Sequence, residues 1–379
     1  MAKEHTEILF AQNRVFRVIG MRLRSIDCLR GLAIVLVLFR HFGIIDILGF
    51  IGWSGVDLFF VLSGFLVSGL LFDEYKKTSA VNPLNFIIRR GLRIYPPFYL
   101  LILFTIAKSL IVVLLEIPGN QSFAWSRVLA EIFFMQNYFD RLWAHTWSLA
   151  IEEHFYLMLI LLVMFLVQAN QMLNTRLMIG MAVSVAFGCA ILRYLNFTTS
   201  TFTIDTHMFY THLRIDSLCF GVILSWFFHF HRSDYNSFVT RFQLLIALAG
   251  VCFVIPIFIF SPDTFVMNVF GLTITYLGFG CVLMLCVHHE HFLAGSGFFA
   301  KFIAWPFAYI GYHSYSVYLW HLPVLVYFAQ PMSNYFGGVD EIGFILYFTG
   351  SIIVGVVAHR LIEKPILRLR DKTFAHVRG

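Results

Sequence analysis

Arg30 and His41 lie eleven residues apart in a single apolar run, residues 29–41. On a helix, eleven residues make three turns plus about 20°, so both side chains would share one face about 16 Å apart. That distance is half of a bilayer core of roughly 30 Å, which would place an imidazole deep in a membrane-spanning segment. A histidine can take a proton from a hydroxyl near neutral pH, and ionisable groups in lipid usually mark functional sites. For an isolated residue, a histidine that only packs between helices is the stronger alternative.

Two adjacent glutamates, Glu152 and Glu153, follow Trp147 near the start of another apolar segment. Glu153 would lie about 9 Å below the outer surface, close to the depth predicted for His41. Neighbouring side chains on a helix are about 100° apart, so we expect only one glutamate to face a shared cavity. That glutamate would orient His41 and stabilise its imidazolium. The alternative is that both carboxylates simply stabilise a helix N-terminus.

Three arginines, Arg89, Arg90 and Arg93, precede the apolar segment 94–116. Arg90 and Arg93 are three residues apart, so they share a helix face on the predicted cytoplasmic side. Guanidinium groups bind phosphate through paired hydrogen bonds. The alternatives are topological positive charge and contact with anionic lipid head groups.

Charged and polar residues also lie in or beside other apolar segments. Arg214 and Asp216 are two residues apart, so their side chains point about 200° apart and need partners on different helices. Asp57 lies near an outer end, and His321 lies deep in a later segment. His288, His289, Glu290 and His291 form a tract without regular ligand spacing, so we expect no metal site.

Small residues, Ser63, Gly64, Ser68 and Gly69, follow Asp57. Gly64 and Ser68 form a small-xxx-small pattern, which predicts close helix packing.

The composition indicates an all-α polytopic membrane protein. Of 379 residues, 59% are hydrophobic and only 13% are charged, whereas soluble domains average about 25% charged residues. The six cysteines form no pattern typical of a disulfide framework. About ten segments are long enough to span, and Phe123–Asn137 is too broken to span and is interfacial or re-entrant. The ten segments are 30–48, 54–72, 94–116, 147–168, 176–195, 211–230, 242–260, 266–287, 305–329 and 342–361.

Lys and Arg concentrate in segments that fall on one side when ten spans are counted. The positive-inside rule then places both termini in the cytoplasm. We expect the protein to lie in the cell membrane (the inner or plasma membrane). We divide the chain into a basic cytoplasmic segment (1–24), one transmembrane domain (25–368) and a cytoplasmic tail (369–379). Basic residues beside apolar spans reflect topology, so we expect membrane lipids and no nucleic acid as partners.

The sequence resembles the acyltransferase-3 family of integral membrane acyltransferases. The resemblance runs from about Ser25 to Arg368. Cys28, Ala150 and His154 replace a usual Gly, Ser and Gln. Five motifs that occur in the family's order carry the resemblance: Arg30-x10-His41; Phe59–Gly64; Arg90-x-x-Arg93; Thr146–Leu149 with Glu152-Glu153; and Tyr318–His321.

The resemblance implies transfer of an acyl group, commonly acetyl from acetyl-CoA, to a hydroxyl of an extracytoplasmic glycan or lipid-linked sugar. It implies that His41 is the essential catalytic residue, with the two glutamates in support. The rival hypothesis is a secondary transporter with charged residues at mid-membrane, but no paired broken segments are seen. The residues expected on the donor side are Arg30, Arg89, Arg90, Arg93 and Ser63, and those expected near the acceptor are Asp57, Trp147, Arg214, Asp216 and His321.

Overall fold

The computed structural model describes residues 23–115 and 124–373, and within these ranges the chain is helical with no strand. Eight helices of the described residues are long and apolar enough to cross a membrane. The predicted class, an all-α polytopic membrane protein, is therefore confirmed. Most of the predicted N-terminal segment 1–24 lies outside the described residues.

The helices follow one another through short connections, and a π-helical turn begins or interrupts four of them. The helices are α2 (Arg24–His41), α3 (Asp46–Ile51), α4 (Ser54–Thr78), α5 (Pro83–Leu114), α6 (Trp125–Ile132), α7 (Trp147–Gln168), α8 (Thr175–Thr199), α9 (Ile204–Met208), α10 (Thr211–Phe230), α11 (Arg232–Val254), α12 (Pro256–Ile259), α13 (Leu272–His288), α14 (Glu290–Leu293), α15 (Trp305–Tyr312), α16 (Ser314–Val324), α17 (Gln330–Tyr335), α18 (Asp340–Ala358) and α19 (Lys364–Thr373). The π-helical turns are η1 (Met267–Gly271), η2 (Ala300–Ala304), η3 (Leu325–Ala329) and η4 (His359–Glu363).

Two of the ten predicted spans differ from the eight long apolar helices. The first, 30–48, is replaced by α2, whose 18 residues include four charged side chains, and by the separate α3. The second, 305–329, is divided at His313 into α15 and α16. The count of ten spans and the side of each terminus thus remain predictions.

α2 ends earlier than the predicted span 30–48. The backbone leaves the helix at Phe42, with φ −139° and ψ 92°, so His41 is the last helical residue of α2. The sequence did not reveal this break because the apolar run continues past the helix end, and the depth of His41 in the membrane stays a prediction. The spacing of Arg30 and His41 along one helix is retained, at about 16 Å.

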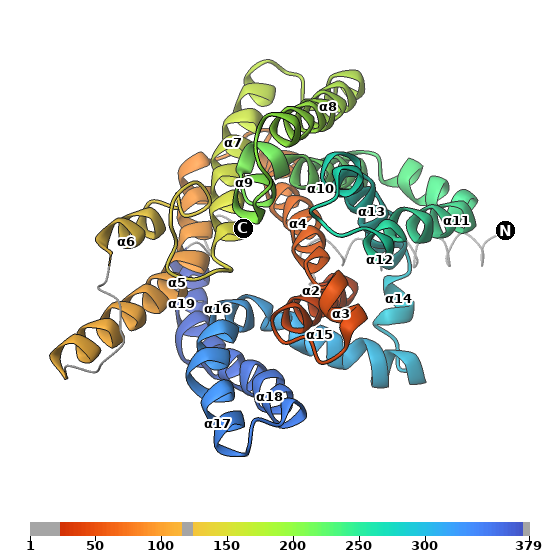
Figure 1. Ribbon diagram of the computed structural model, residues 1–379. Helices are drawn as coiled ribbons and strands as arrows, with labels where there is room; N and C mark the ends of the chain where they lie inside the picture. The colour runs from red at the N-terminus through yellow and green to blue at the C-terminus, as the bar shows by residue number, and fades with distance from the viewer. Residues whose placement is uncertain (1–22, 116–123, 374–379) are drawn as a thin grey trace.

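α4 lies at the centre of the helix arrangement (Figure 1). It packs against α2 and α13, and most extensively against α10. α2 is covered by α15, α16 packs on α18, and α7 packs on both α4 and α5. The space bounded by α2, α4, α5, α7 and α16 is where the candidate site lies.

The close contact of α4 with α10 depends on two glycines. A Cβ atom on Gly64 would lie 2.0 Å from the carbonyl oxygen of Leu218, and one on Gly221 would lie 2.3 Å from that of Val61. Both distances are far shorter than a van der Waals contact, so neither position accepts a side chain. The packing role predicted for Gly64 is confirmed.

Candidate active site

A cavity opens between α2, α4, α5, α7 and α16. Charged side chains from three helices line it: Arg30 (α2), Arg90 and Arg93 (α5), and Glu152 and Glu153 (α7). Its volume is about 190 Å³, and it adjoins a second cavity of about 430 Å³. The two share Arg30, Leu66, Leu70 and Arg93, so they meet at the two arginines, and we call the two cavities together the path.

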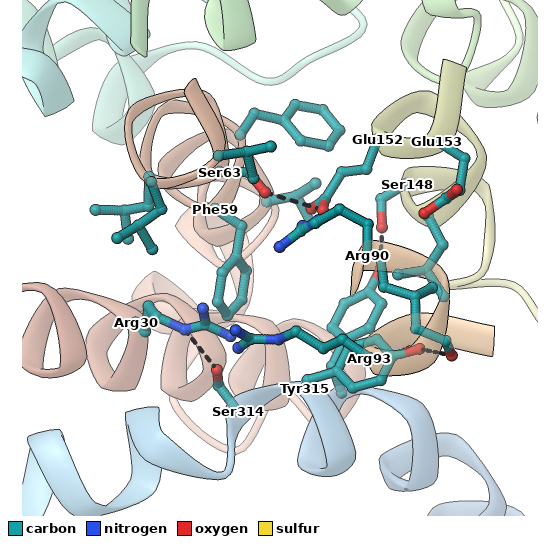
Figure 2. A pocket seen from close by; sticks show the side chains of 18 of the residues that line it. Arg30, Phe59, Ser63, Arg90, Arg93, Ser148, Glu152, Glu153, Ser314 and Tyr315 are labelled. Carbon is teal, nitrogen blue, oxygen red and sulfur yellow. Dashed lines mark hydrogen bonds between the residues drawn. The ribbon is translucent and has the colours of Figure 1, made fainter. Parts of the chain in front are cut away.

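Arg30 and Arg93 point toward one another across this path (Figure 2). Arg30 Nε donates to Ser314 Oγ at 3.1 Å, which fixes its guanidinium against α16. Among residues 23–115 and 124–373, no carboxylate lies within ion-pair distance of Arg93. A guanidinium without an ion-paired carboxylate favours an anionic ligand, so Arg93 is a candidate phosphate contact.

The second cavity extends this path toward the C-terminal helix. Arg370 of α19 lines it, together with Asp73 and His229 at the ends of α4 and α10. α19 continues across residue 368, where we expected the transmembrane domain to end. The helix thereby supplies a third arginine to the path.

Arg90 also lines the cavity, near the two glutamates (Figure 2). Its guanidinium covers the ring of Tyr156 at 4.3 Å from the centroid. Ser63 Oγ donates to Glu152 Oε2 at 2.9 Å, and Tyr156 hydrogen-bonds to the same carboxylate. Tyr95 Oη donates to Glu153 Oε2 at 3.0 Å.

The expectation that only one glutamate faces the cavity was wrong, because both line it. Glu152 faces α4 through Ser63, and Glu153 faces α5 through Tyr95. The 100° between the two side chains is accommodated because the cavity lies between those two helices. Both carboxylates share Arg90 as their neighbouring cation.

His41 is grouped with other histidines and does not line the cavity. Its ring centroid lies 5.0 Å from that of His321, which lies 4.7 Å from that of His145. In the described parts of the chain, no hydrogen bond or ion pair joins His41 to either glutamate. The expected glutamate partner of His41 is therefore replaced by His321, since the glutamates lie beside Arg90.

The protonation of His321 follows from its hydrogen bond. Nδ1 lies 2.6 Å from the carbonyl oxygen of Tyr318, and because a carbonyl only accepts, Nδ1 carries the proton. Nε2 is buried and has no hydrogen-bond partner among the described residues. The fully buried ring therefore keeps one nitrogen lone pair uncommitted, beside His41.

Tyr318 separates the cavity from the histidines. It lines the cavity, and its ring contacts His145 at 5.2 Å and His321 at 5.6 Å. Its Oη donates to the carbonyl oxygen of His145 at 2.6 Å, so Ser148 Oγ donates to Tyr318 Oη at 2.7 Å. We gave Tyr318 no role from sequence, although its place three residues before His321 puts both on one helix face.

His145 lies in the segment between α6 and α7, which Glu131 of α6 holds in place. Glu131 Oε1 accepts from the Leu142 backbone N–H at 3.0 Å and from Thr146 Oγ1 at 2.8 Å. Burial raises the pKa of the Glu131 carboxyl to about 7. The hydrogen bonds lower the same pKa, but by less than burial raises it. With eight residues, α6 is too short to span, as expected for this region.

Asp57, Arg214 and Asp216 form buried ion pairs and do not line the cavity. Arg214 Nη2 lies 2.6 Å from Asp57 Oδ1, and Arg193 Nη2 lies 2.9 Å from Asp216 Oδ2. The predicted need for partners on different helices is confirmed, since Asp57 is on α4 and Arg193 on α8. We overlooked Arg193, although a lone arginine in the apolar segment 176–195 was a visible signal.

Trp147 and Arg89, two more of the predicted site residues, also lie outside the cavity lining. Trp147 is buried and stacks on Phe209, with ring centroids 4.2 Å apart. Arg89 is half-buried on α5 and lines neither cavity of the path.

Fold and site thus define a multi-pass membrane protein with an arginine-lined path that ends at a group of histidines. Residues 23–360 match the acyltransferase domain family, and the chain belongs to this acyltransferase-3 family. The predicted resemblance is therefore confirmed.

Curated relatives carry O-acetyltransferase names. The chain is 28% identical over 374 residues to O-acetyltransferase OatA of Staphylococcus aureus (strain NCTC 8325 / PS 47), covering 93% of this chain and 58% of that protein. It is 28% identical over 361 residues to peptidoglycan O-acetyltransferase OatA of Listeria monocytogenes serovar 1/2a, covering 90% and 55% respectively. The chain thus spans a little over half the length of these relatives. No solved structure matches it.

Proposed function

We propose that the protein transfers an acetyl group from acetyl-CoA to a hydroxyl of an extracytoplasmic glycan. One observation carries the proposal: the cavity that is lined by Arg30 and Arg93 is also lined by Tyr318, whose ring contacts His321, the neighbour of His41. The peptidoglycan O-acetyltransferase name of a relative supports a glycan as acceptor. The membrane is the cell membrane, with the donor on the cytoplasmic side.

The donor would occupy both cavities. The phosphates of acetyl-CoA bind Arg30 and Arg93, with Arg370 within reach of the nucleotide in the wider cavity. The narrower cavity takes the pantetheine arm and the thioester. Phe59 and Ser148 line it beside Tyr318, and its volume of about 190 Å³ suits a thin chain better than a nucleotide.

His41 acts as the general base in this proposal. It takes the proton of the acceptor hydroxyl, whose oxygen attacks the thioester carbonyl carbon. A C–O bond forms, the C–S bond breaks, and the CoA thiolate leaves and takes up a proton. His321 is a positioning residue: its Nε2 lone pair, uncommitted beside the His41 ring, would accept from the second ring nitrogen of His41 when that ring is protonated, and so stabilise the imidazolium.

The test of the proposed function is mass spectrometry of surface glycans from cells with and without the gene. We expect the acetyl-sized mass increment to disappear without the gene and to return with the wild-type gene but not with His41→Ala. Glycans that keep the increment in gene-deleted cells would contradict the proposal. A transporter would instead show substrate flux that does not depend on CoA.

Replacing Arg93 by alanine is expected to raise the KM for acetyl-CoA by about 10- to 100-fold, because a hydrogen bond to a charged group contributes about 1.5–3 kcal/mol. The kcat should change much less, since the guanidinium lies far from the histidines along the path. Radiolabelled acetyl transfer in membrane vesicles measures both values. Arg89→Ala is the matched control, because Arg89 is on the same helix and lines neither cavity. Equal effects of the two substitutions would argue against a specific phosphate contact.

Replacing His321 by glutamine is expected to lower kcat by about 10- to 100-fold, the loss typical when a group that orients a functional side chain is removed. The KM for acetyl-CoA should stay near the wild-type value, and the pH profile of kcat should move, because His41 loses the group that stabilises its protonated form. The control is His207→Gln, since His207 is also fully buried with an unpartnered Nε2 but lies on α9. An unchanged pH profile for His321→Gln would contradict the positioning role.

A further inference from the structure

A second concave surface lies apart from the donor path, between the segment that joins α6 to α7 and the beginning of α10. We call it the outer groove and define it by Asn137, Tyr138, Arg141, Asp205 and Tyr210. Its volume is about 720 Å³, within the roughly 300–1,000 Å³ of small-ligand sites. The predicted topology places these connections on the extracytoplasmic side.

Aromatic rings form one wall of the outer groove. The rings of Tyr138 and Tyr210 are stacked with centroids 4.9 Å apart, and His212 stacks on Tyr138 at 5.9 Å. Tyr138 Oη bonds to His212 Nδ1 at 3.0 Å, which fixes the ring, and Tyr138 remains 37% exposed. A rigid, partly exposed ring of this kind offers a flat apolar surface to a ligand.

Asn137 lines the same groove and carries an unsatisfied acceptor. Its Nδ2 donates to the carbonyl oxygen of Phe209 at 3.2 Å and to Thr211 Oγ1 at 2.9 Å, and this fixes the orientation of the amide. Its Oδ1 is buried and has no hydrogen-bond partner among the described residues, and the residue as a whole is only 2% exposed. A buried carbonyl oxygen without a donor is costly, so it favours a ligand with a hydroxyl or amide N–H.

The outer groove is also lined by both charges of an ion pair. Arg141 Nη2 lies 2.6 Å from Asp205 Oδ1, and the Asp205 side chain is 55% exposed. These side chains can therefore both donate and accept hydrogen bonds. Asp140, which also lines the groove, lies 3.6 Å from Arg127, so the net charge around the groove stays near zero. This suits a polar, neutral ligand better than an anion.

We propose that the outer groove binds a pyranose unit of the glycan acceptor. A pyranose ring has an apolar face of C–H groups that packs on an aromatic ring, and hydroxyls around its edge that both donate and accept. Tyr138 would take the face, Asn137 Oδ1 would accept from an edge hydroxyl or N-acetyl N–H, and Asp205 would bond to the far edge. A lipid chain would fill the groove but leave Asn137 Oδ1 without a donor.

The outer groove is linked by packing to the histidines. Arg141 covers the ring of Phe209 at 4.7 Å, and Phe209 stacks on Trp147 at the start of α7. The segment that carries Tyr138 and Arg141 continues to His145, whose ring contacts His321. A glycan held in the groove would thus extend along this segment toward His41, an inference that rests on the proposed function.

The test compares Tyr138→Leu with Tyr138→Phe in the full-length protein in detergent, with acetyl-CoA as donor and a pentamer of N-acetylglucosamine as the acceptor probe. Loss of the aromatic face should raise the KM for the pentamer about tenfold, whereas phenylalanine keeps the face and should stay within about twofold of wild type. The KM for acetyl-CoA should be the same in all variants. Tyr335→Leu is the control, since Tyr335 is 81% exposed on α17 and lies outside the groove.

Each outcome of this experiment is decisive. A KM for the pentamer that is unchanged in Tyr138→Leu, or equally raised in Tyr138→Phe, would overturn the groove assignment. Wild-type protein that releases CoA from acetyl-CoA but neither binds nor acetylates the pentamer would overturn an aminosugar chain as its occupant. Wild-type protein that never consumes acetyl-CoA would instead contradict the proposed function, so the two failures are distinguishable.

Discussion

Replacement of His41 by alanine is expected to lower acetyl transfer by about 10²- to 10⁴-fold, the contribution typical of a positioned general base. His41 ends α2, with His321 as the nearest ring, and its removal leaves the acceptor hydroxyl without a proton acceptor. The half-buried imidazole makes no hydrogen bond that holds helices together in the described parts of the chain, so folding should be retained. Radiolabelled acetyl transfer measures the loss, and size-exclusion elution with thermal melting reports the fold.

The control for His41→Ala is His291→Ala, which removes an exposed imidazole from α14 and should leave transfer unchanged. Binding of acetyl-CoA should also persist in His41→Ala, because the arginines of the path are untouched. Wild-type rates in His41→Ala would exclude His41 as the base. Loss of both donor binding and thermal stability would show that the residue has a structural role instead.

The helical segments were largely predictable from sequence, because lipid selects long apolar runs regardless of their partners. The residues at which the helices begin and end were less predictable. α5 begins at Pro83, where Asn82 Oδ1 accepts from the Asn85 backbone N–H, and not at residue 94. The asparagine followed by proline was a start signal, but the arginines that follow resemble a loop in composition. Arg90 and Arg93 therefore lie within α5 and are fixed more rigidly than residues of a loop.

The partners of the site residues could not be predicted in the same way. Periodicity gives the direction of a side chain around its own helix, and this correctly required separate partners for Arg214 and Asp216. It does not say which neighbouring helix lies in that direction. A glutamate of α7 was expected beside His41 from its depth, whereas Glu152 and Glu153 lie near Arg90, and Tyr318 of α16 lies between their cavity and the histidines. Depth is one coordinate of three, so matching depths do not establish a contact.

The ion pair between Asp57 and Arg214 leads to the second large prediction. Both side chains are at most 2% exposed, so Asp57→Leu would leave the Arg214 guanidinium buried without its carboxylate. Breaking a buried pair in this way costs about 3–5 kcal/mol of folding free energy. We expect Asp57→Leu to accumulate poorly and to melt at a clearly lower temperature than wild type, as measured by fluorescence-detected size exclusion after heating.

The double substitution Asp57→Leu with Arg214→Met decides between a structural and a substrate-binding role for this pair. Replacing both charges by apolar side chains of similar size is often neutral for stability, so the double variant should recover the thermal stability that the single variant loses. If the pair only joins α4 to α10, acetyl transfer should recover as well. Asp57 Oδ2 has no hydrogen-bond partner among the described residues, which is the observation in favour of a substrate contact. A double variant that is as stable as wild type but has a raised KM for the glycan would therefore assign the pair to acceptor binding, because folding and recognition would then have been separated in one protein.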